Sequence, residues 1–245
     1  MREASPIGSI GVVVAMAAEA RVLAPRGVVP DRIVPLGEGA ALLLGGMGPA
    51  AAHGAAAALA DGGARALATF GVAGALAEGV RNGTLFCPDL ILGDDGREGI
   101  PDPAWRTALL ARLAAVSSPV LRTGTLLSIS RPPLGAADKT QAGSRYAATA
   151  VDMESAAVAA VAKERGLPFL ALRAIVDEAG DTVPSALLGG LDAWGRPRRW
   201  AFAATLARHP MLLAYLPGLA SRMRHALRAL HEAADAAGHA FGWSR

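Results

Sequence analysis

The stretch TAVDMESAAVAAVAKERGLPFLALRAIVDEAGD, residues 149–181, decides the fold class. An apolar run reaches Val151, and an alanine-rich segment with helical spacing follows it. A second apolar run then ends in acids, of which Asp177 is the first. Short strands that alternate with helices are typical of α/β proteins with a mainly parallel sheet. The stretch therefore predicts a strand, a helix and a strand, in that order.

The same alternation fills residues 1–183. Further apolar runs predict strands at 10–16, 39–48, 65–76, 83–92 and 120–130. Helical spacing covers 49–63 and 103–116, and the first of these segments begins with Pro49 and is followed by glycines, as helices prefer. We expect one α/β domain over residues 1–183, with a central mixed, mainly parallel sheet flanked by helices.

Residues 184–245 differ in composition. They hold three of the four tryptophans and a cluster of arginines, and prolines interrupt them at 197, 210 and 217. This pattern predicts a loop and two or three helices, which together form a C-terminal helical extension.

The composition argues against several classes of protein. No uninterrupted apolar run reaches the ~18 residues that span a bilayer. The N-terminal segment has no proper signal peptide, because Glu19 and Arg21 follow its apolar run at once. We therefore expect a soluble, cytoplasmic protein. The net charge is only +3 and aromatic residues make up 4%, without basic–aromatic interleaving, so no nucleic-acid partner is expected.

Metal and cofactor chemistry finds no support. The single cysteine, Cys87, excludes internal disulfides and any multi-cysteine metal site. The five histidines include no pair at metal-ligand spacing with an acid between them, and there is no G-x-S-x-G motif. We expect neither a metal nor a cofactor.

Acids and glycines stand where the predicted strands end, which is where α/β sheets bind ligands. These residues are Glu19, Gly46, Gly71, Asp152 and Asp177. A carboxylate accepts two hydroxyl hydrogens, which suits the vicinal diol of a sugar, so Asp152 and Glu154 are candidate sugar ligands. Asp177 is a candidate general acid, provided that burial raises its pKa.

Each acid also has a purely structural interpretation. Asp152, Glu154 and Glu19 lie near helix starts, where an acid caps the helix or complements its dipole by ~0.5–1 kcal/mol. Asp177 could be a turn residue, and Arg21 is most simply a surface residue. The residues alone leave both interpretations open.

The sequence GGMGPAA, residues 45–51, matches the dinucleotide fingerprint G-x-G-x-x-A only superficially. That motif is normally accompanied by an acid at the end of the following strand. Here the following strand ends in ATFGVAG, without an acid. We therefore prefer a glycine loop that faces a phosphate, a water or a sugar, and an NAD oxidoreductase has little support.

Four ordered stretches resemble the nucleoside phosphorylase and nucleosidase superfamily. They are GVVVAMAAEA, LLLGGMGPAAA, FGVAGAL and VDMESAAVAAVAKERGLPFLALRAIVD, and they span residues 10–177. The third is similar to the family's T-G-S-A-G-G turn, and the fourth to its M-E-[ST/A]-A helix and R-x-I-[ST]-D strand. The resemblance implies a nucleoside phosphorylase-like fold, cleavage of the N-ribosidic bond of a purine nucleoside, and a homodimer or larger assembly.

The resemblance also implies roles for individual residues. Met153 and Glu154 would line the ribose, Asp177 would protonate the purine at its imidazole nitrogen, and Glu19 would position an attacking water. The turn that would face the substrate consists of Gly71, Val72, Ala73 and Gly74. A phosphate nucleophile stays open as well, since Arg21 and the helix-start turn of Gly46, Met47 and Gly48 could bind an anion.

The chain departs from the family pattern at three places. Val72 stands where the glycine turn has a serine, and Val176 stands where the closing strand has a serine or threonine. The aromatic residue that stacks on the purine is missing from SISRPPLGAADK, residues 128–139. These departures make a non-catalytic nucleoside-binding module an alternative.

The stretches AAEAR, VDMES, LRAIVDEAGDTVP and ARHPMLLAYLPGLASRMRHALRAL resemble the hopanoid-associated phosphorylase branch of this superfamily. That resemblance implies removal of adenine from adenosylhopane, a lipid-linked nucleoside of hopanoid biosynthesis. A soluble methylthioadenosine or adenosylhomocysteine nucleosidase is the alternative within the superfamily.

The last predicted helix has an apolar stripe with basic neighbours, a pattern of helices that lie at membrane interfaces. The stripe consists of Leu219, Met223, Ala226, Leu227 and Leu230, and the basic residues are Arg222, Arg224, Arg228 and His231. Residues 196–231 could thus make a peripheral contact with the inner membrane. The alternative is an amphipathic helix packed on the domain.

Overall fold

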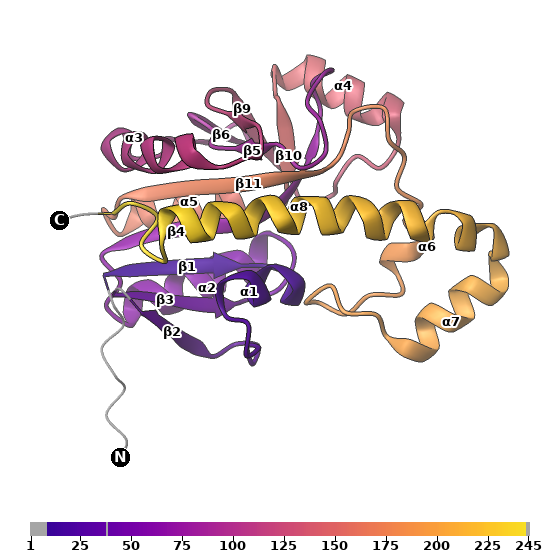
Figure 1. The fold of residues 1–245 in the computed structure, drawn as a ribbon, viewed down its shortest axis with the longest axis horizontal. Coiled ribbons are helices and arrows are strands. Elements are labelled where there is room, and N and C mark those ends of the chain that lie inside the picture. Colours follow the sequence, from indigo (N-terminus) through magenta and orange to yellow (C-terminus); the bar gives the residue numbers. More distant parts are fainter. Residues whose placement is uncertain (1–8, 38, 244–245) are drawn as a thin grey trace.

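The computed structural model describes residues 9–37 and 39–243. Within them, a mixed sheet of eleven strands carries helices on both faces (Figure 1). The fold class predicted from the sequence is confirmed: six of the strand pairings are parallel and four are antiparallel.

The strands are β1 (Ile10–Val14), β2 (Ile33–Gly37), β3 (Ala40–Leu44), β4 (Ala66–Ala75), β5 (Leu85–Phe86), β6 (Leu90–Gly93), β7 (Glu98–Gly99), β8 (Val120–Leu121), β9 (Thr125–Ser128), β10 (Ala150–Asp152) and β11 (Phe169–Asp177). The helices are α1 (Ala17–Leu23), α2 (Pro49–Asp61), α3 (Pro103–Arg112), η1 (Leu113–Ala115), α4 (Ala136–Tyr146), α5 (Ser155–Glu164), α6 (Ser185–Leu188), α7 (Arg199–Arg208), η2 (Pro210–Ala214) and α8 (Leu216–Ala237).

Strand β4 organises the sheet because it pairs with three others. It lies parallel to β1 and β11 and antiparallel to β10. The segments that follow β1, β10 and β11 therefore meet around the end of β4, and these are the segments that carry the predicted site residues.

Two predicted strands are wrong in extent. The run 83–92 is divided into β5 and β6, and Pro88 lies in the break, where it has no N–H to donate to a ladder. The run 120–130 is divided into β8 and β9, and Gly124 in the break has a φ of +130° that favours glycine. Helix α4 was not predicted, because its sequence AADKTQAGSRY has few large apolar residues.

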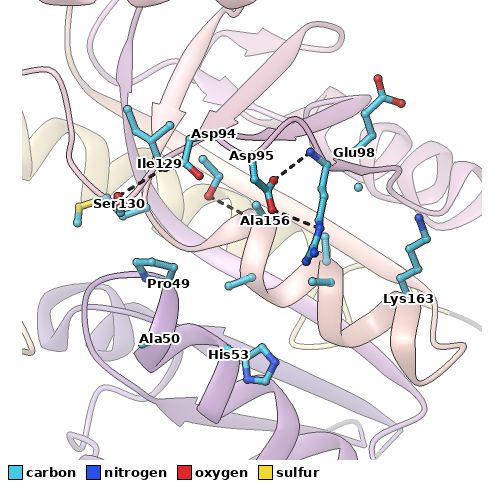
Figure 2. Close-up of a pocket in the computed structure, with 18 of the residues that line it drawn as sticks. Pro49, Ala50, His53, Asp94, Asp95, Glu98, Ile129, Ser130, Ala156 and Lys163 are labelled. Carbon is cyan, nitrogen blue, oxygen red and sulfur yellow. Dashed lines mark hydrogen bonds and ion pairs between the residues drawn. The ribbon is translucent and has the colours of Figure 1, made fainter.

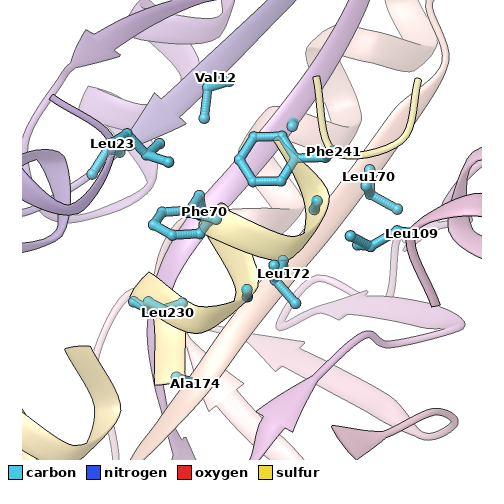
Figure 3. Close-up of a cluster of buried hydrophobic side chains, with 14 of the residues drawn as sticks. Val12, Leu23, Phe70, Leu109, Leu170, Leu172, Ala174, Leu230 and Phe241 are labelled. Atoms are coloured by element: carbon cyan, nitrogen blue, oxygen red, sulfur yellow. The ribbon is translucent and has the colours of Figure 1, made fainter. Parts of the chain in front are cut away.

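Helix α8 covers one face of the sheet and completes the core there. Its Leu230 is fully buried against a cluster that includes Phe70 and Leu172, and Phe241, just beyond the helix, lies 5.5 Å from Phe70 between ring centroids (Figure 3). Within the apolar stripe, Ala226 and Leu230 are buried and the other members are half-buried. The stripe thus packs on the domain, as the alternative interpretation expected.

Residues 184–215 form a lobe at one end of the molecule, built from α6, α7 and η2 (Figure 1). Large apolar side chains are exposed here, and the most exposed is Trp200 at 90%. The others are Leu188, Met211, Leu213 and Tyr215. No helix of the described residues combines the length and the apolar character needed to cross a membrane.

The packing of α8 leads to a stability prediction. Leu230→Ala should lower the free energy of unfolding by about 2–5 kcal/mol, because it leaves a cavity under α8. Urea unfolding would measure the change. Leu213→Ala is the matched control, since Leu213 is 55% exposed, and it should change stability by less than about 0.5 kcal/mol. Equal losses in both variants would show that α8 is not part of the core.

Candidate active site

The carboxylate of Glu19 is buried in the first turn of α1 and joins two strands. It accepts a hydrogen bond from Met16 N at the helix start (2.9 Å) and another from Val72 N in the glycine turn of β4 (2.8 Å). The predicted capping role is therefore present. The second hydrogen bond also places the carboxylate at the end of β4, beside the turn that was predicted to face the substrate.

Gly71 allows charged groups to approach the backbone of β4. A Cβ added there would lie 2.6 Å from Glu19 Oε1 and 2.6 Å from Arg173 Nη1, closer than atoms can approach. Only glycine fits this position, because any side chain would displace the two charged groups. The glycine turn thus makes room for charged side chains here.

Glu154 brings the glycine turn after β3 to the start of α5. Its Oε1 accepts a hydrogen bond from Gly48 N (2.8 Å), and Met153 N donates to Oε2 (3.3 Å). Glu154 lies close enough to Glu19 and Asp152 for each to raise its pKa. The structure therefore brings Glu19, Met153 and Glu154 together, as the sequence predicted.

Asp152 is held by other protein groups. Its Oδ2 forms an ion pair with Arg173 Nη2 (2.6 Å) and accepts from Ser155 Oγ (2.5 Å). The same guanidinium donates to Ser155 Oγ and Thr69 Oγ1. Asp152 thus serves as the counter-ion of a fully buried arginine, an arrangement that differs from its predicted contact with a sugar. Sequence analysis assigned no role to Arg173, although the R-x-I pattern contains it.

Asp177 ends β11 just after an irregularity in its pairing with β4, and its carboxylate lies against Gly74. An added Cβ at Gly74 would lie 3.1 Å from Asp177 Oδ2. The ammonium of Lys139, from α4, forms an ion pair with the same oxygen. Gly71 and Gly74 therefore place Glu19 and Asp177 at two points along the end of a single strand.

Burial dominates the acidity of this cluster. It raises the pKa of Glu154 to about 7, with repulsion from Asp152 as the next contribution and the Arg173 guanidinium opposing both. Burial also raises the pKa of Glu19, against Arg173 and the backbone amides that face it. The pKa of Asp177 is raised by burial, while Lys139 lowers it. A general acid at Asp177 requires that burial raises its pKa, and burial does raise it.

The predicted phosphate ligands lie in less suitable places. Arg21 is exposed on α1, whereas the guanidinium beside Glu19 belongs to Arg173. Three of the four amides of the turn 45–48 have protein acceptors: Gly45 N donates to Val14 O, Met47 N to Ala193 O and Gly48 N to Glu154. Gly46 has a φ of +105°, which shapes this turn.

The segment 193–195, which was assigned to the C-terminal extension, closes the site from one side. Ala193 O accepts from Met47 N (2.8 Å) and Trp194 O accepts from Ala17 N (2.9 Å). The indole Nε1 of Trp194 lies near Gly46, and it is buried without a hydrogen-bond partner among the described residues. Sequence reasoning missed Trp194, because only the folded chain brings it to the turn.

A cavity with a volume of about 740 Å³ lies beside Met153 (Figure 2), and Glu19, Glu154 and Asp177 are not among the residues that line it. It runs between α2 and α5, and its polar lining includes His53, Asp94 and Ser130. Met153 is the one predicted site residue that lines it. Ile129 lies where a purine-stacking aromatic was expected. In the described residues, no group of three His, Cys, Asp or Glu side chains could hold a metal ion.

A comparison with protein families matches residues 9–188 to the model described as Phosphorylase superfamily. The chain belongs to this superfamily. The matched segment includes all the predicted site residues. None of the curated proteins compared with the chain matches it.

Solved structures of superfamily-like fold are similar over nearly the whole chain. Futalosine hydrolase of Helicobacter pylori strain 26695 has a TM-score of 0.65 at 18% identity, covering 94% of this chain and 98% of that one. The Helicobacter pylori 5'-methylthioadenosine/S-adenosyl homocysteine nucleosidase has a TM-score of 0.65 at 17% identity, and the match covers 94% of this chain and 99% of that one. The corresponding Streptococcus pneumoniae nucleosidase has a TM-score of 0.61 at 21% identity, and the match covers 91% of this chain and 98% of that one. At these identities the likeness establishes the fold.

The pKa of Glu154 leads to a pH-dependent prediction. Because the folded state raises this pKa from 4.5 to about 7, the protonated group stabilises the fold below pH 4.5, and this contribution is lost as the pH rises through 7. Glu154→Gln keeps the acceptor for Gly48 N without the charge. It should therefore be more stable than the wild type at pH 7.5, by on the order of 2 kcal/mol, with a smaller difference at pH 5.

Urea unfolding at the two pH values would measure this difference. Glu164→Gln is the matched control, because Glu164 is exposed at the end of α5, the helix that follows Glu154. This variant should show no such pH dependence. A wild-type chain that is as stable as Glu154→Gln at pH 7.5 would contradict the burial of an unfavourable charge at 154.

Proposed function

We propose that this member of the phosphorylase superfamily cleaves the N-ribosidic bond of purine nucleosides, and that water is the nucleophile. The observation that carries the proposal is that Glu19 and Asp177 lie against Gly71 and Gly74 of the same strand, β4, and that Glu154 lies near Glu19. All three carboxylates are largely shielded from solvent, and burial raises the pKa of each. Such groups, brought together at a ligand edge, suit acid–base chemistry.

The proposed roles follow from the chemistry of the bond. The purine is a poor leaving group, and its departure leaves positive charge on the ribose. Asp177 protonates the imidazole nitrogen of the purine, so that the base leaves as a neutral molecule. Glu154 accepts hydrogen bonds from the ribose hydroxyls and lies near the developing positive charge, with Met153 beside it. Glu19 positions the water and accepts its proton.

Two features favour water over phosphate. The amides of Gly45, Met47, Gly48 and Val72 already donate to protein oxygens, so they offer no ready anion cradle. The site also holds several carboxylates, and the nearby Arg173 is committed to Asp152. A phosphate dianion would have to enter this environment against like charge.

The direct test incubates the purified chain with adenosine, methylthioadenosine and adenosylhopane, with and without phosphate. Hydrolysis predicts free adenine and a free ribosyl product at a rate that phosphate does not change. A ribose 1-phosphate product would show that phosphate, and not water, is the nucleophile. Binding of adenosine without release of adenine would support the non-catalytic alternative.

Asp177→Asn should lower kcat by about 10²–10⁴-fold, because the purine then leaves without a proton. Adenine release measures the loss, and circular dichroism checks that the fold is retained. Asp61→Asn, which removes a carboxylate from an exposed ion pair with Arg165, is the control and should keep wild-type activity. Full activity in Asp177→Asn would assign the proton donor to another group.

We infer further that the nucleoside carries an apolar group, with adenosylhopane as the substrate suggested by the resemblance. The lobe 184–215 supports this, because segment 193–195 contacts the turn at Met47 while the same lobe exposes Trp200 and Met211. An apolar extension of the ribose could leave the site along this surface. Turnover of methylthioadenosine in preference to adenosylhopane would support the soluble nucleosidase instead.

The charge around the lobe suits an anionic membrane. From residue 193 to 231 the chain has seven arginines and no acid. Arg198, Arg199 and Arg208 are exposed, near the exposed apolar side chains of α7 and η2. Apolar side chains flanked by basic groups bind at the surface of anionic bilayers, which supports a peripheral location at the inner membrane. A homodimer or larger assembly stays a prediction.

The double substitution Trp200→Ser and Met211→Ser should weaken binding to phosphatidylglycerol-containing vesicles at least about tenfold, because it removes most of the insertable apolar surface. Vesicle sedimentation measures binding, and turnover of vesicle-borne adenosylhopane should fall in parallel, with methylthioadenosine turnover unchanged. Ile100→Ser, at a 69% exposed position outside the lobe, is the control. Unchanged vesicle binding in the double variant would rule out the lobe as the membrane contact.

A further inference from the structure

Lys139 is a fully buried cation in a chain that has only one other lysine, Lys163. Its side chain is 1% exposed, whereas Lys163 is exposed. Lysines are almost never buried without a partner. Apart from these two lysines and the histidines, every basic side chain is arginine, and Lys139 is the lysine that is buried.

The structure positions Lys139 through the elements around α4. Leu134, just before the helix, accepts a hydrogen bond from Val183 N (2.8 Å). On the helix, Gly143 packs so closely on Leu76, the residue that follows β4, that an added Cβ would lie 3.0 Å from Leu76 O. These contacts hold α4 against the site, and α4 presents Lys139 to the end of β11.

The ammonium contacts one oxygen of Asp177 and leaves the other available. Nζ donates to Asp177 Oδ2 and to Glu178 O (2.9 Å). In the part of the chain that the structure describes, no protein group donates to Asp177 Oδ1. This oxygen can therefore meet a substrate while Oδ2 stays paired.

The other charges near Asp177 are paired with one another. Asp181, in the loop after β11, raises the pKa of Asp177, whereas Arg222 of α8 lowers it. These two form an ion pair with each other (2.6 Å), so their effects on Asp177 partly offset. Glu178 is paired with Arg81 (2.8 Å). Lys139 is thus the cation in direct contact with Asp177.

We propose that Lys139 is a positioning residue for the proton donor: it holds Asp177 Oδ2 and stabilises the carboxylate that remains once Oδ1 has given its proton to the purine. This inference rests on the proposed function. In the step, the Oδ1–H bond breaks and an N–H bond forms on the imidazole nitrogen. The bond from C1′ to the purine breaks and its electron pair leaves with the base. Water then binds C1′ and gives its proton to Glu19, while Lys139 stays an ammonium.

The test compares wild type with Lys139→Met, which keeps the length of the side chain without its charge. Activity requires protonated Asp177, so it falls as the pH rises through the pKa of this group. Removing the cation raises that pKa, and the alkaline limb of kcat/KM should move up by about one to three pH units. At the same time the plateau of kcat should fall about 10–100-fold, because the departing carboxylate lacks its partner.

A purely structural role would lower activity without moving the limb. Lys163→Met is the matched control and should leave both plateau and limb in place. Lys139→Gln, which retains a hydrogen-bond donor, replaces Lys139→Met if the latter does not fold, and it should show the same shift. An alkaline limb that stays in place in a folded Lys139 variant would overturn the proposal.

A second readout does not depend on turnover. ¹³C NMR of carboxyl-labelled aspartate, with the Asp177 signal assigned from Asp177→Asn, follows the titration of this group directly. It should titrate about one to three pH units higher in Lys139→Met than in wild type. An unchanged titration would overturn the inference about Lys139. Absence of adenine release from the wild type, with the titration shifted, would instead reject the proposed function.

Discussion

The buried guanidinium of Arg173 is the interaction on which this site depends. Several carboxylates are withdrawn from water around the end of β4, and an uncompensated buried charge costs several kcal/mol. Arg173 pairs with Asp152, hydrogen-bonds Ser155 and lies close enough to Glu19 to lower its pKa. Because β11 runs beside β4 in parallel register, Arg173 stands opposite Gly71, the residue that leaves room for it. The pairing of β11 with β4 therefore places the positive charge that balances the carboxylates of the site.

Helix capping and ligand binding turn out to be compatible uses of the same acids. Glu19 accepts a hydrogen bond from the start of its own helix, and its other oxygen reaches Val72 on a different strand. Glu154 stands just before α5 and accepts from Gly48. Both carboxylates are therefore oriented before any substrate arrives, and a preoriented group needs little reorganisation during a reaction. The structural and functional interpretations of these residues describe the same hydrogen bonds.

The sequence predicted those parts of the molecule whose signal is local. Apolar runs and helical spacing identified the α/β domain. The rule that ligands bind at strand ends selected Glu19, Asp152 and Asp177, and Glu154 was chosen beside Asp152 as a ligand for a sugar diol. The rule could not select partners that arrive from elsewhere in the chain. Lys139 lies on a helix with few large apolar residues, and Trp194 lies in a turn of the C-terminal segment. Arg21 was considered because it is close to Glu19 in the sequence. The guanidinium beside that acid comes instead from Arg173, on a strand that is far from Glu19 in the sequence.

The packing of α8 has a consequence for the synthesis of the protein. Residues 226–241 cover Phe70 and Leu172, which emerge from the ribosome much earlier. Until residues 226–241 have been translated, one face of the sheet has no cover, and strands with an open apolar face are prone to associate with other chains. Folding of this face therefore waits until these residues have left the ribosome, and chaperones that bind apolar segments have an exposed surface to protect in the meantime.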